Sequence, residues 1–104
     1  MAFSGSEPPS MMEVDRLVHE PARFMIMSYL CVVEKADFLF LRKQVGLTRG
    51  NLSSHMTKLE EAGYIKVKKT FKGRKPNTML SITKKGRKAY NAYTKQMKRV
   101  FVEL

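Results

Sequence analysis

Residues 48–65 read TRGNLSSHMTKLEEAGYI, and this stretch decides the fold. Thr48 is a candidate N-cap, since a threonine hydroxyl accepts a hydrogen bond from the free N–H groups at a helix start. Apolar residues follow at the three- and four-residue spacing of a buried helix face: Leu52, Met56 and Leu59. Gly63 ends the pattern, because glycine readily adopts the left-handed conformation found just beyond a helix. The stretch therefore predicts a helix over residues 49–62 with one buried face.

The opposite face of this helix is small and polar. It carries Gly50, Ser53, Ser54, Thr57 and Lys58, with Asn51 and His55 on its flanks. Short donors and acceptors allow close approach to base edges and phosphates. An ordinary solvent-exposed face is the alternative interpretation, and His55 has a second alternative as a hydrogen-bonding group on the flank of the helix.

The residues that precede this helix predict two more helices. The first begins at Glu20-Pro21, because proline suits a first helical turn and an acid suits the positive end of the helix dipole. Asp37 is placed as the N-cap of a short helix that ends at Gly46. A short helix joined to residues 49–62 by a brief turn has the proportions of a helix-turn-helix, whose second helix enters the major groove.

After Tyr64 the apolar pattern changes to the two-residue period of strands. Two alternating runs on either side of residues 72–77 predict a β-hairpin with a long exposed loop. The hairpin is strongly cationic through Lys66, Lys68, Lys69, Lys72, Arg74 and Lys75. Such a loop can follow a phosphate backbone or reach into a minor groove. Lysines also protect exposed strand edges from aggregation, which is the alternative for the lysines alone.

The charge of the chain is concentrated in its second part. The 104 residues carry a net charge of +11, but residues 1–63 hold seven basic and eight acidic side chains. Residues 64–104 hold thirteen basic side chains and one acid. This asymmetry indicates a polyanionic partner that is contacted mostly by the second part. A lysine-rich surface that is merely solvated is the alternative.

The chain ends in a further predicted helix, which Thr83 caps. Its apolar residues recur at spacings of three and four: Tyr90, Tyr93, Met97, Val100 or Phe101, and Leu104. The stripe continues to the last residue, beyond what a small core needs, and such stripes often meet a second subunit. We expect symmetric dimerisation through this helix, with packing onto the first helix of the same chain as the alternative.

The order of these elements resembles the winged helix-turn-helix transcriptional regulators. Residues 52–65 are similar to the recognition helix and following strand of the MarR and ArsR groups, where a Ser-x-His-Leu-x-x-Leu-x-x-x-Gly-Leu-Val pattern recurs. Residues 71–78, with Leu80, Thr83 and Gly86-Arg87, resemble a small subfamily of stand-alone regulators of this type. The resemblance covers roughly residues 16–95. It implies an α+β fold with a three-helix core, a two-stranded wing and a C-terminal dimerisation helix.

The resemblance also implies how the residues divide their roles in a homodimer on a palindromic operator. The recognition helix is expected to contact DNA through Thr48, Arg49, Asn51, Ser53, Ser54, His55 and Lys58. The wing, residues 66–78, is expected to contact it through Lys69, Lys72, Arg74, Lys75 and Asn77. The predicted organisation is a flexible segment over residues 1–15, a DNA-binding domain over 16–83 and a dimerisation helix over 84–104.

Other functions find little support in the sequence. Cys31 is a lone cysteine in an apolar helix, and His19 and His55 lack the spacing of metal ligands, so we expect neither a metal nor a cofactor. The histidines have no evident nucleophile or acid partner, so the chain is not expected to be an enzyme. It shows no signal peptide and no membrane span, which favours the cytoplasm. A small-molecule effector stays open as a partner, although no residue pattern supports one.

The sequence therefore predicts a dimeric regulator that binds specific double-stranded DNA. Two other classes stay open. One is an architectural, chromatin-like protein that binds DNA without an operator, and the other is a winged helix that serves as a protein-interaction module.

Overall fold

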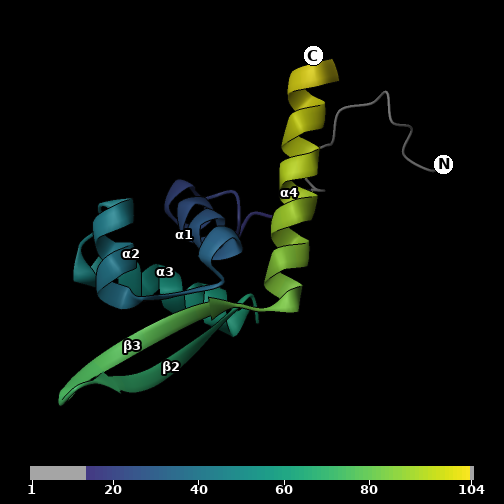
Figure 1. Ribbon diagram of the computed structural model, residues 1–104. Coiled ribbons are helices and arrows are strands. Elements are labelled where there is room, and N and C mark those ends of the chain that lie inside the picture. The colour runs from purple at the N-terminus through teal and green to yellow at the C-terminus, as the bar shows by residue number, and fades with distance from the viewer. Residues whose placement is uncertain (1–13, 104) are drawn as a thin grey trace.

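The computed structural model describes residues 14–103, with side chains to Val102. Its elements follow the order α1 (Pro21–Val33), β1 (Lys35–Asp37), α2 (Phe38–Val45), α3 (Arg49–Glu61), β2 (Ile65–Lys72), β3 (Lys75–Ile82) and α4 (Lys84–Glu103). Figure 1 shows α1, α2 and α3 gathered above the hairpin formed by β2 and β3, while α4 rises beside them as a column. This arrangement is the predicted winged helix-turn-helix.

The predicted helix starts are confirmed by their capping hydrogen bonds. The Oδ1 atom of Asp37 accepts from the backbone N–H of Phe40 at 2.7 Å and starts α2. The hydroxyl of Thr48 accepts from the backbone N–H of Asn51 at 3.1 Å and starts α3. Glu20 caps α1 in the same way. Each cap satisfies a donor that the helix leaves without a partner in its first turn.

The end of α3 uses a glycine in the left-handed region, as predicted. Gly63 has a φ of +79°, and its N–H donates to the carbonyl of Glu60 at 2.9 Å. The N–H of Tyr64 donates to the carbonyl of Leu59 at 3.0 Å. These two bonds form a Schellman motif, which turns the chain sharply from the recognition helix into β2.

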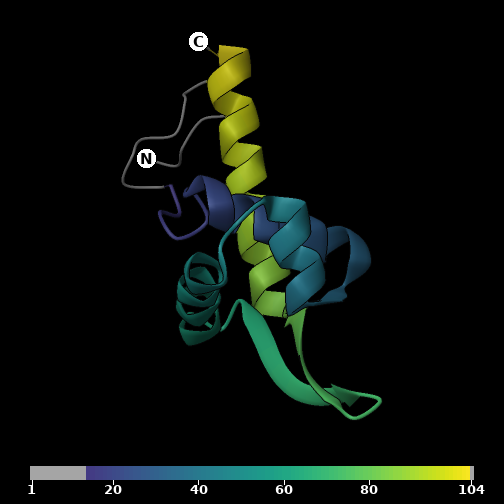
Figure 2. The same ribbon diagram turned by 90° about the vertical axis from the view of Figure 1, so that its left-hand side faces the viewer.

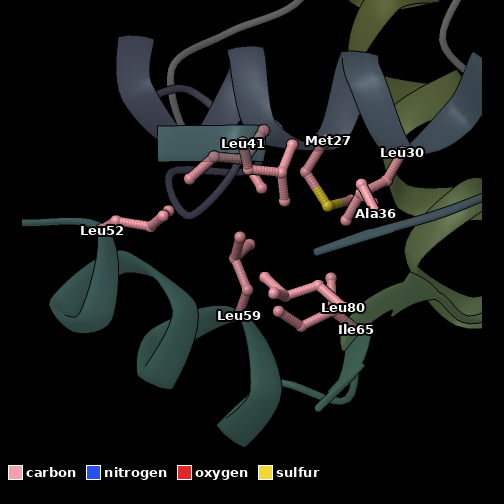
Figure 3. Packing of buried hydrophobic residues seen from close by; sticks show 9 residues of the cluster. Met27, Leu30, Ala36, Leu41, Leu52, Leu59, Ile65 and Leu80 are labelled. Carbon is pink, nitrogen blue, oxygen red and sulfur yellow. The ribbon is translucent and has the colours of Figure 1, made fainter. Parts of the chain in front are cut away.

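The larger of two hydrophobic clusters in the described residues fixes the position of α3. Its fully or almost fully enclosed members are Ile26, Met27, Leu30, Ala36, Leu41, Leu52, Leu59, Ile65 and Leu80. Figure 3 shows Leu59 pointing from α3 into the middle of this cluster. Leu52 and Leu59 have no exposed surface, and Met56 is half-buried between them along the helix. The inward face predicted from the sequence is therefore the observed one.

The sheet contains a strand that the sequence pattern did not predict. The strand order is β1-β3-β2, and β1 pairs antiparallel with β3 so that Ala36 lies opposite Leu80. Glu34 directs the chain into β1 with a φ of +69° and accepts a hydrogen bond from the N–H of Ile82 at 3.1 Å. The three residues of β1 are too few to show the two-residue period of a strand. The pairing of β1 with β3 is therefore seen in the fold but could not be predicted from the spacing of apolar residues.

The wing is tighter than expected. Lys72 pairs with Lys75, so a turn of two residues, Gly73 and Arg74, replaces the predicted long loop over residues 72–77. Gly73 has a φ of +65° at the first central position, where a type II′ turn requires glycine. Pro76 belongs to β3 beyond the stretch that pairs with β1, so its missing N–H falls where β3 has a free edge.

The segment before α1 is tied to the body of the domain. Val14 is buried, and the Oδ1 atom of Asp15 accepts from the N–H groups of Leu17 and Val18 at 2.9 and 3.2 Å. The hydroxyl of Tyr64 donates to the other carboxylate oxygen of Asp15 at 2.6 Å. Two residues of the segment predicted to be flexible are thus packed, and residues 1–13 lie outside the described part of the chain.

The start of α4 is joined closely to the turn after α3. The hydroxyl of Thr83 accepts from the N–H of Gly86 at 3.0 Å, as the predicted cap requires, and donates to the carbonyl of Gly63 at 2.6 Å. A Cβ on Gly86 would meet the carbonyl group of Tyr64, whose carbon lies 2.8 Å away. Only a residue without a side chain permits this close approach.

Candidate nucleic-acid interface

The outward face of α3 is exposed and polar, as the sequence predicts. Its exposed residues are Arg49, Gly50, Asn51, Ser53, Ser54, Thr57 and Lys58. Because Leu52 and Leu59 hold the inward face in the core, the outward face has a fixed orientation on the domain. Thr48 is exposed at the start of the helix, where its hydroxyl oxygen is used by the cap. This face offers short hydrogen-bonding groups on a rigid helix.

His55 does not lie freely on this face, because its imidazole already has partners within the domain. The imidazole is half-buried, and the guanidinium of Arg23 donates to its Nδ1 atom over 3.1 Å. Arginine can only donate, so Nδ1 is an acceptor and carries no proton. The Nε2 atom faces the carboxylate of Glu20, 3.6 Å away. The alternative of a hydrogen-bonding group on the helix flank is therefore the observed one.

The partner of His55 shows how α1 holds the recognition helix. Arg23 is 9% exposed, and its Nε atom donates to the carbonyl of Leu17 at 2.6 Å while Nη1 reaches His55. A buried guanidinium is costly unless its donors are satisfied. Arg23 therefore links the segment before α1 to α3 through polar contacts, in addition to the apolar core. Sequence reasoning missed Arg23, because its partners lie 6 and 32 residues away along the chain.

The wing presents exposed cations along both strands. Its exposed basic residues are Lys66, Lys68, Lys69, Lys72, Arg74 and Lys75. Arg74 lies in the two-residue turn at the tip. Lys72 lies 3.6 Å from the carboxylate of Asp37, but the lysine itself is exposed, so the pair contributes little and the lysine stays available to other anions. These residues form a cationic surface next to the helix-turn-helix.

The side chains of two wing residues, Lys69 and Asn77, are directed at neighbours in the hairpin. The ammonium of Lys69 lies 3.4 Å from the hydroxyl of Thr78, across the strand pair. The amide nitrogen of Asn77 lies 3.4 Å from the sulfur of Met79, and Asn77 is half-buried. Of the five wing residues predicted to contact DNA, Asn77 is therefore the least accessible.

Figure 2 shows α3 and the hairpin as two separate projections on the lower side of the domain, with α4 extending away from both. The helix α3 and the wing thus lie away from the far half of α4. The predicted DNA contacts on these two elements, apart from His55 and Asn77, are exposed. The predicted dimer contacts are separate from them.

Half of the stripe on α4 packs within the chain. Tyr93 is 8% exposed and packs with Val14 and Val18, and Met97 packs on the same cluster. The ring of Tyr90 stacks on Phe24 with 5.4 Å between centroids, and its hydroxyl lies 2.7 Å from that of Ser28. The alternative of packing on the first helix is observed for Tyr90 and Tyr93, whose rings contact Phe24, while Met97 packs on the cluster of Val14, Val18 and Tyr93.

The far end of α4 is different. Phe101 is 86% exposed, and Val100 on the same stripe is partly exposed. Leu104, the last residue of the predicted stripe, lies outside the described residues. An exposed phenyl ring on an apolar stripe that continues the packed one is available for contact with another chain.

Metal ligands do not gather in the described residues. Within residues 14–103, His, Cys, Asp and Glu form no group of three that could hold an ion. Cys31 is half-buried, and burial raises the pKa of its thiol, although the nearby Arg87 acts in the opposite direction. In the same part of the chain, every helix is too short or too polar to cross a bilayer.

A helix-turn-helix followed by a cationic β-hairpin defines a winged helix domain of the DNA-binding class. The sequence matches the winged helix DNA-binding domain family over residues 22–101, and the chain belongs to that family. Because this is a DNA-binding family and not a family of enzymes, membership confirms the prediction that the chain is not an enzyme.

Several known proteins are similar to this chain. The uncharacterized protein MJ0432 of Methanocaldococcus jannaschii is 35% identical over 78 residues, which are 75% of this chain and 85% of that protein. A transcriptional regulator homologue from Pyrococcus horikoshii OT3 has a TM-score of 0.79 at 33% identity, over 84% of this chain and 86% of that one. The regulator PcaV from Streptomyces coelicolor, solved with its natural ligand, has a TM-score of 0.72 at 19% identity, over 88% and 65% of the two chains.

These likenesses confirm the winged helix fold and the resemblance to winged-helix transcriptional regulators. PcaV, at its low identity, supports the fold alone. The Pyrococcus horikoshii protein and MJ0432 share most of their length with this chain, and the family match over residues 22–101 extends into α4.

Proposed function

We propose that the protein is a transcriptional regulator that binds specific double-stranded DNA as a homodimer. The observation that carries the proposal is the polar, exposed face of α3 beside a cationic wing, in a member of a DNA-binding family. The helix α3 enters the major groove, and the wing follows the flanking backbone or minor groove. A two-fold dimer reads a roughly palindromic operator, because its recognition helices are related by the same symmetry.

The two surfaces have different tasks in this proposal. Asn51, Ser53 and Ser54 on α3 contact base edges, and Thr48, Arg49 and Lys58 contact bases or nearby phosphates. On the wing, Lys69, Lys72, Arg74 and Lys75 neutralise phosphates, while Asn77 has a minor part. His55 acts indirectly, since its contact with Arg23 holds α3 in place.

Selection of bound duplexes from random DNA tests the proposal. A specific regulator yields one recurrent, two-fold symmetric site, which competes against random duplex by a factor of roughly a thousand or more. If a dimer neutralises about six phosphates, the logarithm of the association constant for duplex DNA falls with log[salt] at a slope of about −5. Absence of duplex binding contradicts the proposal.

An architectural DNA-binding protein is the second candidate, and the excess of basic over acidic residues after Gly63 favours it. Such a protein binds random and selected duplexes equally, so the same competition separates the two. The cationic wing gives no support to a protein-interaction module. A protein of that class is expected to show no salt-dependent binding to duplex DNA.

The dimer contact in this proposal is the far end of α4, where Val100 and Phe101 continue the apolar stripe. Phe101→Glu is expected to shift the protein from dimer to monomer in analytical ultracentrifugation. Val102→Glu is a matched control, because Val102 is 83% exposed but lies off the stripe. Equal behaviour of the two variants would exclude this end of α4 as the interface.

A further inference from the structure

An aromatic residue stands exposed on the wing, outside the core and outside every contact assigned above. Phe71 is 74% exposed near the tip of the hairpin. Residues 68–79 contribute no side chain to the two hydrophobic clusters found among the described residues. Intramolecular packing therefore does not explain why a phenyl ring occupies this place.

Phe71 is one half of an apolar pair. It lies directly opposite Pro76 across the hairpin, and both residues are exposed. Side chains on a strand alternate between the two faces, so Phe71 shares its face with Ile65 and Val67, which pack against the helices. The pair thus lies on the side of the hairpin that is turned toward the helices, but beyond their reach. In both ribbon views the hairpin tip extends past α1, α2 and α3 (Figures 1 and 2).

The surroundings of this pair indicate the kind of partner that covers it. Residues 66–77 carry six basic side chains and no acid. A protein surface complementary to the bare apolar pair would also have to match this charge, whereas duplex DNA offers phosphates on both sides of an apolar stack of bases. A hairpin that ends in a two-residue turn is a narrow element, and a narrow element with flanking cations suits a groove.

We propose that Phe71 and Pro76 form an apolar wedge that enters the minor groove, partly unstacks a base step and kinks the DNA. The inference rests on the proposed binding of duplex DNA and adds a contact to it. Proteins that insert apolar side chains into the minor groove bend the duplex toward the major groove, and phenylalanine and proline are among the residues used. Arg74, between the two strands at the turn, holds the adjacent phosphates or the groove floor.

The wedge gives the wing a role in selecting DNA. Pyrimidine–purine steps unstack more easily than others, so the operator carries such a step where each wing lies. The lysines of the wing provide affinity that does not depend on sequence, and Phe71 adds a preference for deformable DNA.

DNA bending and base unstacking test the wedge. The probe is the duplex selected above. A circularly permuted set of this duplex reports the bend by its gel mobility. A second version carries 2-aminopurine at the base step beneath the wing and reports unstacking by its fluorescence. We expect wild type to bend this duplex by at least about 20° and to raise the 2-aminopurine fluorescence. Phe71→Ala loses the bend and the fluorescence rise and binds roughly tenfold more weakly. Phe71→Leu, which keeps an apolar wedge, retains the bend.

Two matched controls isolate the effect. Phe40→Ala removes an exposed phenyl ring from α2 and leaves the bend angle unchanged, and Lys75→Gln lowers the salt dependence without changing the bend. A straight complex with wild type, or an unchanged bend with Phe71→Ala, overturns the wedge while duplex binding itself still supports the proposed function. If wild type binds no duplex, the proposed function fails first.

Discussion

The recognition helix and the wing are built in opposite ways. The helix α3 turns two fully buried leucines into the core, and a third contact joins His55 to the buried Arg23 of α1. Beyond Val67 the wing adds no side chain to the core, and its tip is held by strand pairing, a glycine turn and the exposed Lys72 beside Asp37. The exposed side chains also differ in size and charge, since α3 carries small polar side chains and the wing carries long cationic ones.

In the proposed function, this difference separates the recognition of bases from the attraction to phosphates. Hydrogen bonds to base edges depend on the position of each donor, so they require a helix that cannot shift on its domain. Attraction to phosphates is long-ranged and tolerates flexible lysines on a hairpin that adapts to the backbone. The short side chains lie on the helix that the core holds, and the long charged ones lie on the hairpin that extends from it.

The largest effect is expected when the support of α3 is removed. Leu59→Ala empties space in the middle of the core, so the free energy of unfolding falls by about 2–5 kcal/mol. Phe71→Ala removes an apolar side chain of similar size from the wing, where it is exposed, and changes that free energy by less than about 0.5 kcal/mol. Urea unfolding of both variants measures the contrast, and a similar loss in the two would show that the wing tip is packed.

A smaller effect is expected at the polar contact between α1 and α3. His55→Ala leaves a donor of the buried Arg23 without its acceptor, which costs about 2–3 kcal/mol in unfolding free energy. His55→Asn retains an oxygen acceptor and recovers part of the loss. Lys58→Ala, an exposed change on the same helix, is the control and leaves the stability unchanged. If all three variants unfold alike, the contact does not hold α3.

The features of α3 that were predictable from the sequence are local ones. The cap at Thr48, the closing glycine at Gly63 and the buried spacing of Leu52 and Leu59 each depend on residues within a few positions of one another. The outward face follows from the inward face, because a helix has a fixed turn. The polar surface of α3 could therefore be listed residue by residue before the fold was known.

The features that escaped prediction depend on partners distant in the chain. The side chain of His55 meets Arg23 on another helix, and Tyr93 meets Val14 and Val18 across the domain. The same spacing of apolar residues on α4 serves packing at Tyr93 and exposure at Phe101, because only the fold decides where the body of the domain ends. Periodicity predicts that a face is apolar, but it does not predict what covers it.

The division between recognition and attraction is sharpened by one substitution in each region. Asn51→Ala is expected to reduce the discrimination between the selected site and a site with one changed base pair by about 1–2 kcal/mol. Arg74→Ala is expected to weaken binding to selected and random duplexes alike and to reduce the salt slope by about 1. Fluorescence anisotropy titrations at several salt concentrations measure both. A uniform loss with Asn51→Ala, or a change of preferred base with Arg74→Ala, breaks the division.

The smallest effect is expected at Tyr64, where α3 ends and the wing begins. Its hydroxyl donates to Asp15 at 2.6 Å, and Tyr64→Phe removes this bond at a cost of about 1 kcal/mol in unfolding free energy near neutral pH. Burial, the hydrogen bond to Asp15 and the charge of Asp15 raise the pKa of Tyr64 from 10.0 to about 12. Folding therefore favours the protonated phenol.

The stabilisation from this phenol is complete below pH 10, the ordinary pKa, and is lost as the pH rises toward about 12. Wild type is thus expected to be more stable than Tyr64→Phe at about pH 8, and the difference is expected to shrink at about pH 11.5. Lysines lose charge over the same range in both proteins, so their contribution cancels in the comparison. Urea unfolding at the two pH values measures it. A difference that stays constant would mean that Tyr64 does not donate to Asp15, and that the joint between α3 and β2 is held by the Schellman motif and Thr83 without it.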